Sequence, residues 1–99
     1  MTDLARDLRL AVDTGKVAIG TNEVERAINT SSAKMVVVVS NGKKEAVADI
    51  AHLCNIGGIK FIKFDTGSLE FGAICGKPYS INAVAIIEPG NSNILNESY

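Results

Sequence analysis

The fold is decided by the stretch Ala33-Lys34-Met35-Val36-Val37-Val38-Val39-Ser40, which carries an unbroken apolar run in its middle. A strand with one face in water alternates apolar and polar residues, whereas a strand covered on both faces reads as continuous apolar sequence. The run is also far shorter than a membrane-spanning segment. The stretch therefore predicts a central strand with a layer of structure on each side of its sheet.

Shorter patterns on both sides of this run alternate between helix and strand. Apolar residues at helical spacing predict helices over residues 2–14, 22–30, 43–55 and 66–76, and a brief one around Ile94 and Leu95. Short apolar runs between turn residues predict further strands over residues 16–19, 59–64 and 83–87. This alternation is typical of the α/β class, and we expect a three-layer α/β/α sandwich in one domain over residues 1–99.

The helix predicted over residues 66–76 carries a glycine in its interior. Leu69, Ala73 and Ile74 are expected to face inward at helical spacing. Gly72 lowers the helix propensity, so its presence indicates that another element crosses the helix closely at this point.

The composition describes a chain of 99 residues without a strong overall charge. Its hydrophobic content of 46% suits one modest core, and ten Lys and Arg against 11 Asp and Glu give a formal net charge of -1. No global basic field marks the chain as nucleic-acid-binding, so an RNA site has to rest on local clusters. The N-terminus Met1-Thr2-Asp3 lacks the features of a signal peptide. We expect a cytoplasmic protein in which Cys54 and Cys75 are reduced core thiols.

The sequence offers no constellation typical of an enzyme. His52 is the single histidine, and spacing pairs it with no nucleophile or acid. Gly72 and Gly76 fit neither of the common glycine-rich phosphate-binding motifs, and no ligand spacing is typical of a metal site. We expect no catalytic residue, no metal and no cofactor, although a site built from carboxylates far apart in the sequence stays open.

One polar corner stands out at the junction of a predicted strand and a predicted helix. Gly20-Thr21-Asn22-Glu23-Val24 combines a glycine suited to a tight turn with Thr21 as a helix cap, followed by an amide and a carboxylate. Two interpretations stay open. Asn22 and Glu23 either cap the helix and favour its dipole, or read base edges of irregular RNA with the donors and acceptors that they carry.

A second group of residues has the chemistry of an RNA contact. Lys77-Pro78-Tyr79-Ser80 is a compact loop in which Tyr79 either stacks on an unpaired base or covers the edge of the core. Four further cations fall near the ends of predicted elements, where several of them are expected to share one rim and to contact phosphates: Lys16, Arg26, Lys43 and Lys44. Each alone is usually a solvated surface charge.

These motifs together resemble a known family. Gly20-Thr21-Asn22-Glu23-Val24 resembles the signature of the kink-turn RNA-binding superfamily typified by archaeal ribosomal protein L-seven-Ae. Three stretches are similar to one branch of it, the L-thirty-e proteins of the large ribosomal subunit of archaea and eukaryotes: Leu8-Arg9-Leu10-Ala11-Val12-Asp13-Thr14-Gly15-Lys16, Gly76-Lys77-Pro78-Tyr79, and Ala83-Val84-Ala85-Ile86-Ile87-Glu88-Pro89-Gly90 with Ile94-Leu95. The resemblance covers essentially the whole chain.

The resemblance implies a four-stranded mixed sheet between helices, with RNA bound by loops at one end. It assigns Asn22 and Glu23, next to Gly20 and Thr21 of the signature, to the tandem sheared G·A pairs of a kink-turn, and Arg26 to a nearby contact. It assigns Lys77, Pro78 and Tyr79 to the extruded nucleotides. These roles follow from the resemblance and not from spacing.

The leading hypothesis is a non-catalytic constituent of the large ribosomal subunit that binds a kink-turn-like loop of ribosomal RNA. Its expected partners are ribosomal RNA and other large-subunit proteins, with no membrane, and the free protein is expected to be a monomer in the cytoplasm. Three alternatives remain: a guide-RNA or regulatory kink-turn protein, a protein–protein adaptor of the same fold, and a small-ligand enzyme with a deep pocket.

Overall fold

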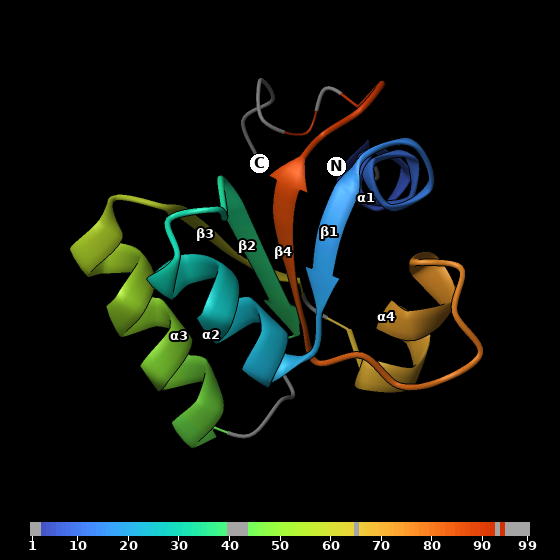
Figure 1. Ribbon diagram of the computed structural model, residues 1–99. Coiled ribbons are helices and arrows are strands. Elements are labelled where there is room, and N and C mark those ends of the chain that lie inside the picture. The colour runs from blue at the N-terminus through green and yellow to red at the C-terminus, as the bar shows by residue number, and fades with distance from the viewer. Residues whose placement is uncertain (1–2, 40–43, 65, 93, 95–99) are drawn as a thin grey trace.

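Four helices and four strands make up the chain in the computed structural model, which describes residues 3–39, 44–64, 66–92 and 94 (Figure 1). The helices are α1 (Asp3–Thr14), α2 (Thr21–Asn29), α3 (Lys44–Gly57) and α4 (Ser68–Ile74). The strands are β1 (Lys16–Ile19), β2 (Met35–Val39), β3 (Lys60–Phe64) and β4 (Ala83–Glu88). Within these described residues, no helix has the length and apolar character to cross a bilayer.

The strands form one mixed sheet in the order β1-β4-β2-β3. β4 is antiparallel to both of its neighbours, β1 and β2, whereas β2 and β3 are parallel. The two inner strands carry the most continuous apolar runs, and all five residues of β2 are buried. The predicted four-stranded mixed sheet and the central position of the valine run are confirmed.

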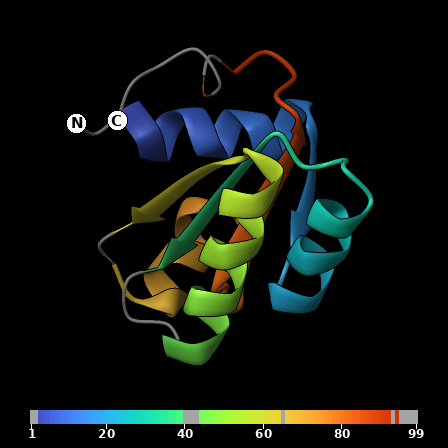
Figure 2. The same ribbon diagram turned by 90° about the vertical axis from the view of Figure 1, so that its left-hand side faces the viewer.

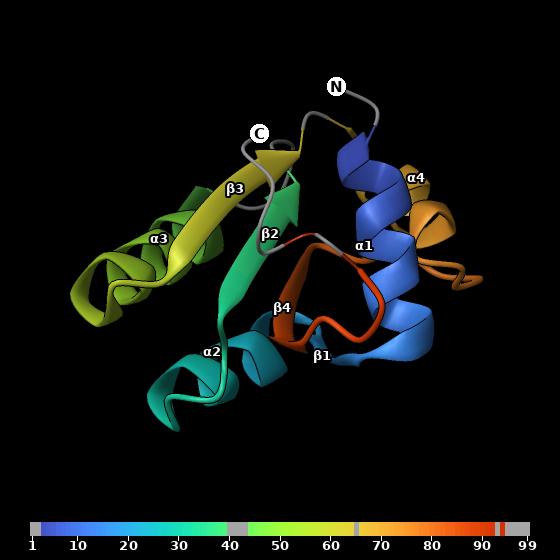
Figure 3. The same ribbon diagram turned by 90° about the horizontal axis from the view of Figure 1, so that it is seen from above.

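Helices cover both faces of this sheet. α2 and α3 lie side by side on one face, and α1 and α4 lie on the other, as the views from the side and from above show (Figures 2 and 3). Val37 and Val39 pack in the cluster with α1 and α4, while Val36 and Val38 pack in the cluster with α2 and α3. The unbroken valine run is therefore an alternating strand whose two faces are both covered, and the predicted three-layer sandwich is confirmed.

The inward face of α4 differs from the prediction. Phe71 and Gly72 are buried, whereas Leu69 is 67% exposed and Ala73 is also exposed, so the prediction was wrong for both of these residues. The centroid of the Phe71 ring lies 5.8 Å from that of Phe64 on β3, so it is the face with Phe71 that packs against the sheet. Ile74, partly buried, follows the prediction.

The described segment after β4 is packed against α1. The Ser92 hydroxyl donates to the Asp7 carbonyl oxygen at 2.6 Å, and Ile94 is fully buried beside α1. The helix predicted around Ile94 and Leu95 and the turn at Asn41-Gly42 lie largely outside the described residues.

The two cysteines are free, buried thiols on opposite faces of the sheet, which confirms that they are core residues. Burial raises the pKa of Cys75 to about 11, with Lys77 and Arg9 nearby opposing that rise, and burial also raises the pKa of Cys54. Both side chains are therefore neutral at physiological pH.

Candidate nucleic-acid interface

The corner between β1 and α2 is built around Gly20. Its backbone angles, φ 100° and ψ 151°, lie in a region that essentially only glycine adopts. The Gly20 N–H donates to the Ala83 carbonyl oxygen at 2.9 Å, and the Gly20 carbonyl oxygen accepts from the Val24 N–H at 2.9 Å. One residue thus ends the strand, begins the helix and anchors the corner to β4.

Gly20 occupies the N-cap position of α2, and no side chain caps the helix. Thr21 is the first residue of α2, and the cap position carries no side-chain hydrogen bond, so the prediction of Thr21 as the cap was wrong. The side chain of Asn22 forms no hydrogen bond within the described part of the chain. Its exposed amide is therefore not used by the helix. Glu23 still lies in the first turn, where its charge favours the helix dipole.

Glu23 and Arg26 face each other one turn apart on the exposed side of α2. Glu23 Oε2 lies 3.9 Å from Arg26 Nη1, and the two side chains are 54% and 74% exposed. A surface pair of this length contributes little to stability. Both groups therefore remain accessible to a ligand at the corner.

We expect Gly20→Ala to lower the free energy of unfolding by about 1–2 kcal/mol, because the added Cβ disfavours a positive φ. Nothing lies within 4 Å of a Cβ at this position, so crowding adds nothing to the effect. Urea unfolding measures the change.

Gly67→Ala is the matched control for this substitution. Gly67 caps α4 without a side-chain bond and also has open space around a Cβ, but its φ is an ordinary -79°. Equal losses at Gly20 and Gly67 would show that the backbone angle of Gly20 is not the cause.

The loop over residues 77–80 is held against α4 at both of its ends. The Lys77 N–H donates to the Gly72 carbonyl oxygen at 2.9 Å, and the Ile81 N–H donates to the Ser68 carbonyl oxygen at 3.0 Å. Between these bonds the Tyr79 carbonyl oxygen lies directly against Gly72, where a Cβ would collide with it. The predicted close crossing at Gly72 is confirmed, and it fixes the backbone that carries Tyr79.

The side chain of Tyr79 is presented to solvent by this loop. It is 51% exposed, and its hydroxyl forms no hydrogen bond within the described residues. Pro78 before it is exposed, and Lys77 is half-buried. An exposed aromatic ring on a pinned backbone is suited to stacking, because little ordering is required when a base arrives.

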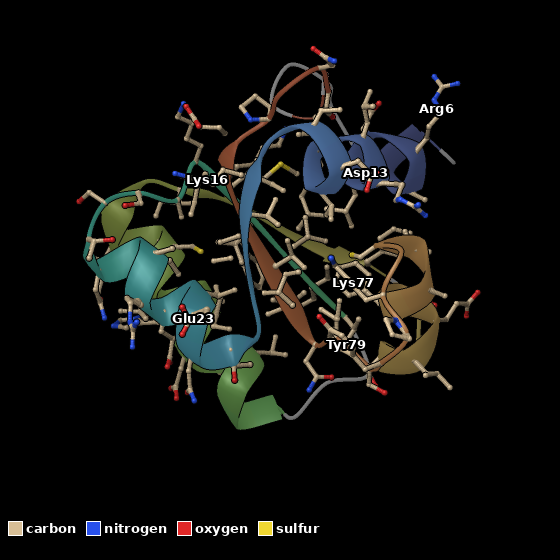
Figure 4. The ribbon with its side chains drawn as sticks, turned by 45° about the vertical axis from the view of Figure 1, so that its right-hand side comes forward. Arg6, Asp13, Lys16, Glu23, Lys77 and Tyr79 are labelled. Carbon is tan, nitrogen blue, oxygen red and sulfur yellow. The ribbon has the colours of Figure 1, made fainter. Side chains whose placement is uncertain are left out.

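The corner and the loop lie at the same end of the sheet. Gly20 is bonded to Ala83 at the start of β4, and the Val39 N–H at the end of β2 donates to the Asn82 carbonyl oxygen at 3.0 Å. Glu23 and Tyr79 are found at this end in Figure 4. We call it the corner end, and it comprises residues 20–23 and the loop over residues 77–82.

The basic residues named from the sequence do not all share this rim. Lys77 belongs to the corner end and Arg26 follows on α2, whereas Lys16 opens β1 at the opposite end of the strand (Figure 4). Four strand residues separate these ends by about 13 Å, so the prediction of a shared rim was wrong for Lys16. Lys43 lies outside the described residues, and Lys44 is the first residue of α3.

One cation beside Lys16 was missed from the sequence. Lys34 precedes β2, and its N–H donates to the Ile86 carbonyl oxygen at 2.8 Å, near the end of β4. The signal was its place directly before the central strand, but only the sheet order shows that Lys34 and Lys16 lie on either side of the end of β4 and line one depression.

The described residues hold no group of side chains suited to a metal ion. No group of three or more His, Cys, Asp and Glu side chains converges among them. His52 is exposed on α3. What the corner end offers instead is one exposed amide, one carboxylate and one aromatic ring on a fixed backbone.

Comparisons with known proteins give a consistent result. The sequence model of the ribosomal protein L7Ae/L30e/S12e/Gadd45 family matches residues 2–96. The chain is 39% identical over 95 residues to the large ribosomal subunit protein eL30 of Pyrobaculum islandicum, covering 96% of this chain and 94% of the relative. It is 39% identical over 93 residues to the eL30 of Methanosphaera stadtmanae (94% and 95% covered) and 38% identical over 94 residues to that of Methanococcus vannielii (95% and 90% covered).

Proposed function

Because the chain belongs to the ribosomal protein L7Ae/L30e/S12e/Gadd45 family and resembles archaeal eL30 proteins over almost its full length, we propose that it is a non-catalytic constituent of the large ribosomal subunit. In this role it binds a kink-turn-like internal loop of ribosomal RNA through the corner end. Other large-subunit proteins are its neighbours, its site of action is the cytoplasmic ribosome, and the free protein is a monomer acting as one domain.

The main observation behind this proposal is that the β1–α2 corner and the loop before β4 lie at the same end of the sheet. Asn22 presents an amide that the helix does not use, and Glu23 lies beside it. Tyr79 is presented at the same end by a loop that is bonded to α4 on both sides. An amide and a carboxylate can bond base edges while the ring stacks on an unpaired base, and irregular RNA displays both features together.

Each residue of the corner end has a distinct proposed role. Asn22 and Glu23 bond the exposed edges of the sheared G·A pairs, while Gly20 and Thr21 bring the backbone close to the RNA. Tyr79 stacks on an extruded nucleotide. The cations Arg26, Lys43, Lys44 and Lys77 contact phosphates, which orients the RNA without reading its sequence.

The small net charge fits a site that relies on shape. Phosphate contacts dominate nonspecific binding, and a chain with a formal net charge of -1 gains little from them as a whole. Discrimination then depends on contacts that only a bent, irregular RNA can satisfy.

The proposal is tested by sequencing the RNA that crosslinks to this protein in its native cells. We expect reads concentrated at an internal loop of large-subunit ribosomal RNA, with the crosslinked peptide containing Tyr79. Reads confined to guide RNAs or messenger RNAs would replace the ribosomal role by a regulatory one, and the absence of any enriched RNA would favour a protein–protein adaptor.

A further inference from the structure

A second surface with unpaired positive charge lies at the end of the sheet opposite the corner end. It is an open depression of about 400 Å³ where β1 begins and β4 ends. We call it the basal depression, and it is lined by Thr14, Gly15, Lys16, Lys34, Glu88, Pro89 and Gly90. None of the residues proposed above to bind the kink-turn lines it.

The floor of the basal depression is fixed backbone. A Cβ on Gly15 would collide with the Glu88 carbonyl oxygen, and a Cβ on Gly90, where φ is 61°, would lie 2.5 Å from Thr14 Oγ1. The Thr14 hydroxyl donates to the Leu10 carbonyl oxygen at 2.7 Å and accepts from the Asn91 N–H at 2.9 Å. These contacts lock two chain segments together, so the concave shape is held without a ligand.

The charge of the basal depression is positive. Lys16 and Lys34 are both exposed, and neither ammonium group has an ion-pair partner among the described residues. Glu88 is the one carboxylate in the lining, so two cations outweigh one anion. The net positive charge of this concave surface attracts a polyanion.

The residues of the lining are suited to contacts with the sugar-phosphate backbone of a nucleic acid and not with its bases. It contains no aromatic ring on which a base can stack and no side-chain amide that reads a base edge. Lysine ammonium groups act as point charges toward phosphate, which gives affinity without sequence preference.

We propose that the basal depression binds the ribose-phosphate backbone of a second RNA segment, so that the protein joins two RNA segments through opposite ends of one sheet. The longest dimension of the protein is 27 Å, so the two segments are held close together. The joining of two segments rests on the proposed function, whereas the contact at the basal depression itself is separate from it, because the lining shares no residue with the proposed kink-turn contacts.

The test uses a fluorescent plain RNA duplex, titrated into the full protein with and without a saturating unlabelled kink-turn RNA. We expect the kink-turn complex to bind the duplex and form a larger ternary complex in sedimentation. In the Lys16→Gln/Lys34→Gln variant, duplex affinity is expected to fall about tenfold or more at low salt, and the slope of log K against log salt to shrink by about two. Glu88→Gln is expected to strengthen duplex binding, because it removes the one repelling charge.

The matched control is Arg6→Gln/Lys63→Gln, which removes the same total charge from exposed positions on α1 and β3. For this variant in complex with the kink-turn RNA, the slope of log K against log salt for duplex binding is expected to stay unchanged. Equal losses in the two double variants, or a kink-turn complex that takes up no duplex, would overturn the second contact. If the kink-turn RNA alone does not bind, the proposed function is contradicted. The titration of the duplex into the protein without kink-turn RNA then shows whether the basal depression binds RNA.

Discussion

Replacing Asn22 with alanine is expected to weaken binding to a kink-turn RNA by about 1–3 kcal/mol, the range of a lost base-edge contact made by a side-chain amide. The amide is exposed and forms no hydrogen bond within the described residues, so its loss removes nothing from the folded protein itself. The free energy of unfolding is therefore expected to change by less than about 0.5 kcal/mol. Calorimetric titration and urea unfolding of the same variant measure the two quantities.

Asn29→Ala is the matched control, since Asn29 is exposed at the far end of the same helix. It is expected to leave RNA affinity unchanged. An Asn22 variant with unchanged affinity and a lower free energy of unfolding would show that Asn22 serves the helix and not the RNA.

Replacing Gly72 with alanine is expected to lower the free energy of unfolding by about 1–3 kcal/mol or more, as overpacking of a closed contact does. The new Cβ collides with the Tyr79 carbonyl oxygen, so either α4 or the loop over residues 77–80 has to move. Because that loop carries Tyr79, kink-turn affinity is expected to fall as well. Urea unfolding and RNA titration measure the two effects.

The neighbouring residue provides a control of opposite sign. Ala73 is exposed within the same helix, so Ala73→Gly is expected to lose only the propensity difference of about 1 kcal/mol. Alanine is thus preferred at position 73 and glycine at position 72. A Gly72→Ala variant that is more stable than the native protein, as propensity alone predicts, would contradict the crossing.

The layers of the fold could be predicted from the sequence because the valine run is compatible only with a strand that is buried on both faces. Five consecutive buried residues require cover on both faces of the strand, and Val36 to Val39 divide between the two clusters as such a strand requires. The strand and helix alternation then placed the remaining elements. Neither argument needs a contact between residues far apart in sequence.

The errors arose where tertiary contacts override local pattern. The face of α4 is set by the contact of Phe71 with Phe64 and by the loop crossing at Gly72, and neither contact is visible in helical spacing. Thr21 has the chemistry of a cap, but the positive φ of Gly20 starts the helix one residue earlier.

The resemblance named both the corner and the loop before β4 and implied that RNA is bound by loops at one end. The residue pattern alone did not group them, and the bond from Gly20 to Ala83 at the start of β4 shows how the fold brings them together. Lys16 was grouped with the wrong end because its closeness to the corner in sequence was given more weight than the strand over residues 16–19, which separates it from Gly20. Lys34, which lines the same depression, is 18 positions away in the chain and lies across β4 in the sheet.

The most direct test of the central claim is a calorimetric titration of the protein with a kink-turn RNA and with a plain duplex of the same length and composition at moderate salt. Two base-edge contacts, from Asn22 and Glu23, give at least about 2 kcal/mol of discrimination. The kink-turn is therefore expected to bind about thirtyfold or more tightly than the duplex. Equal affinities for the two RNAs would contradict the central claim.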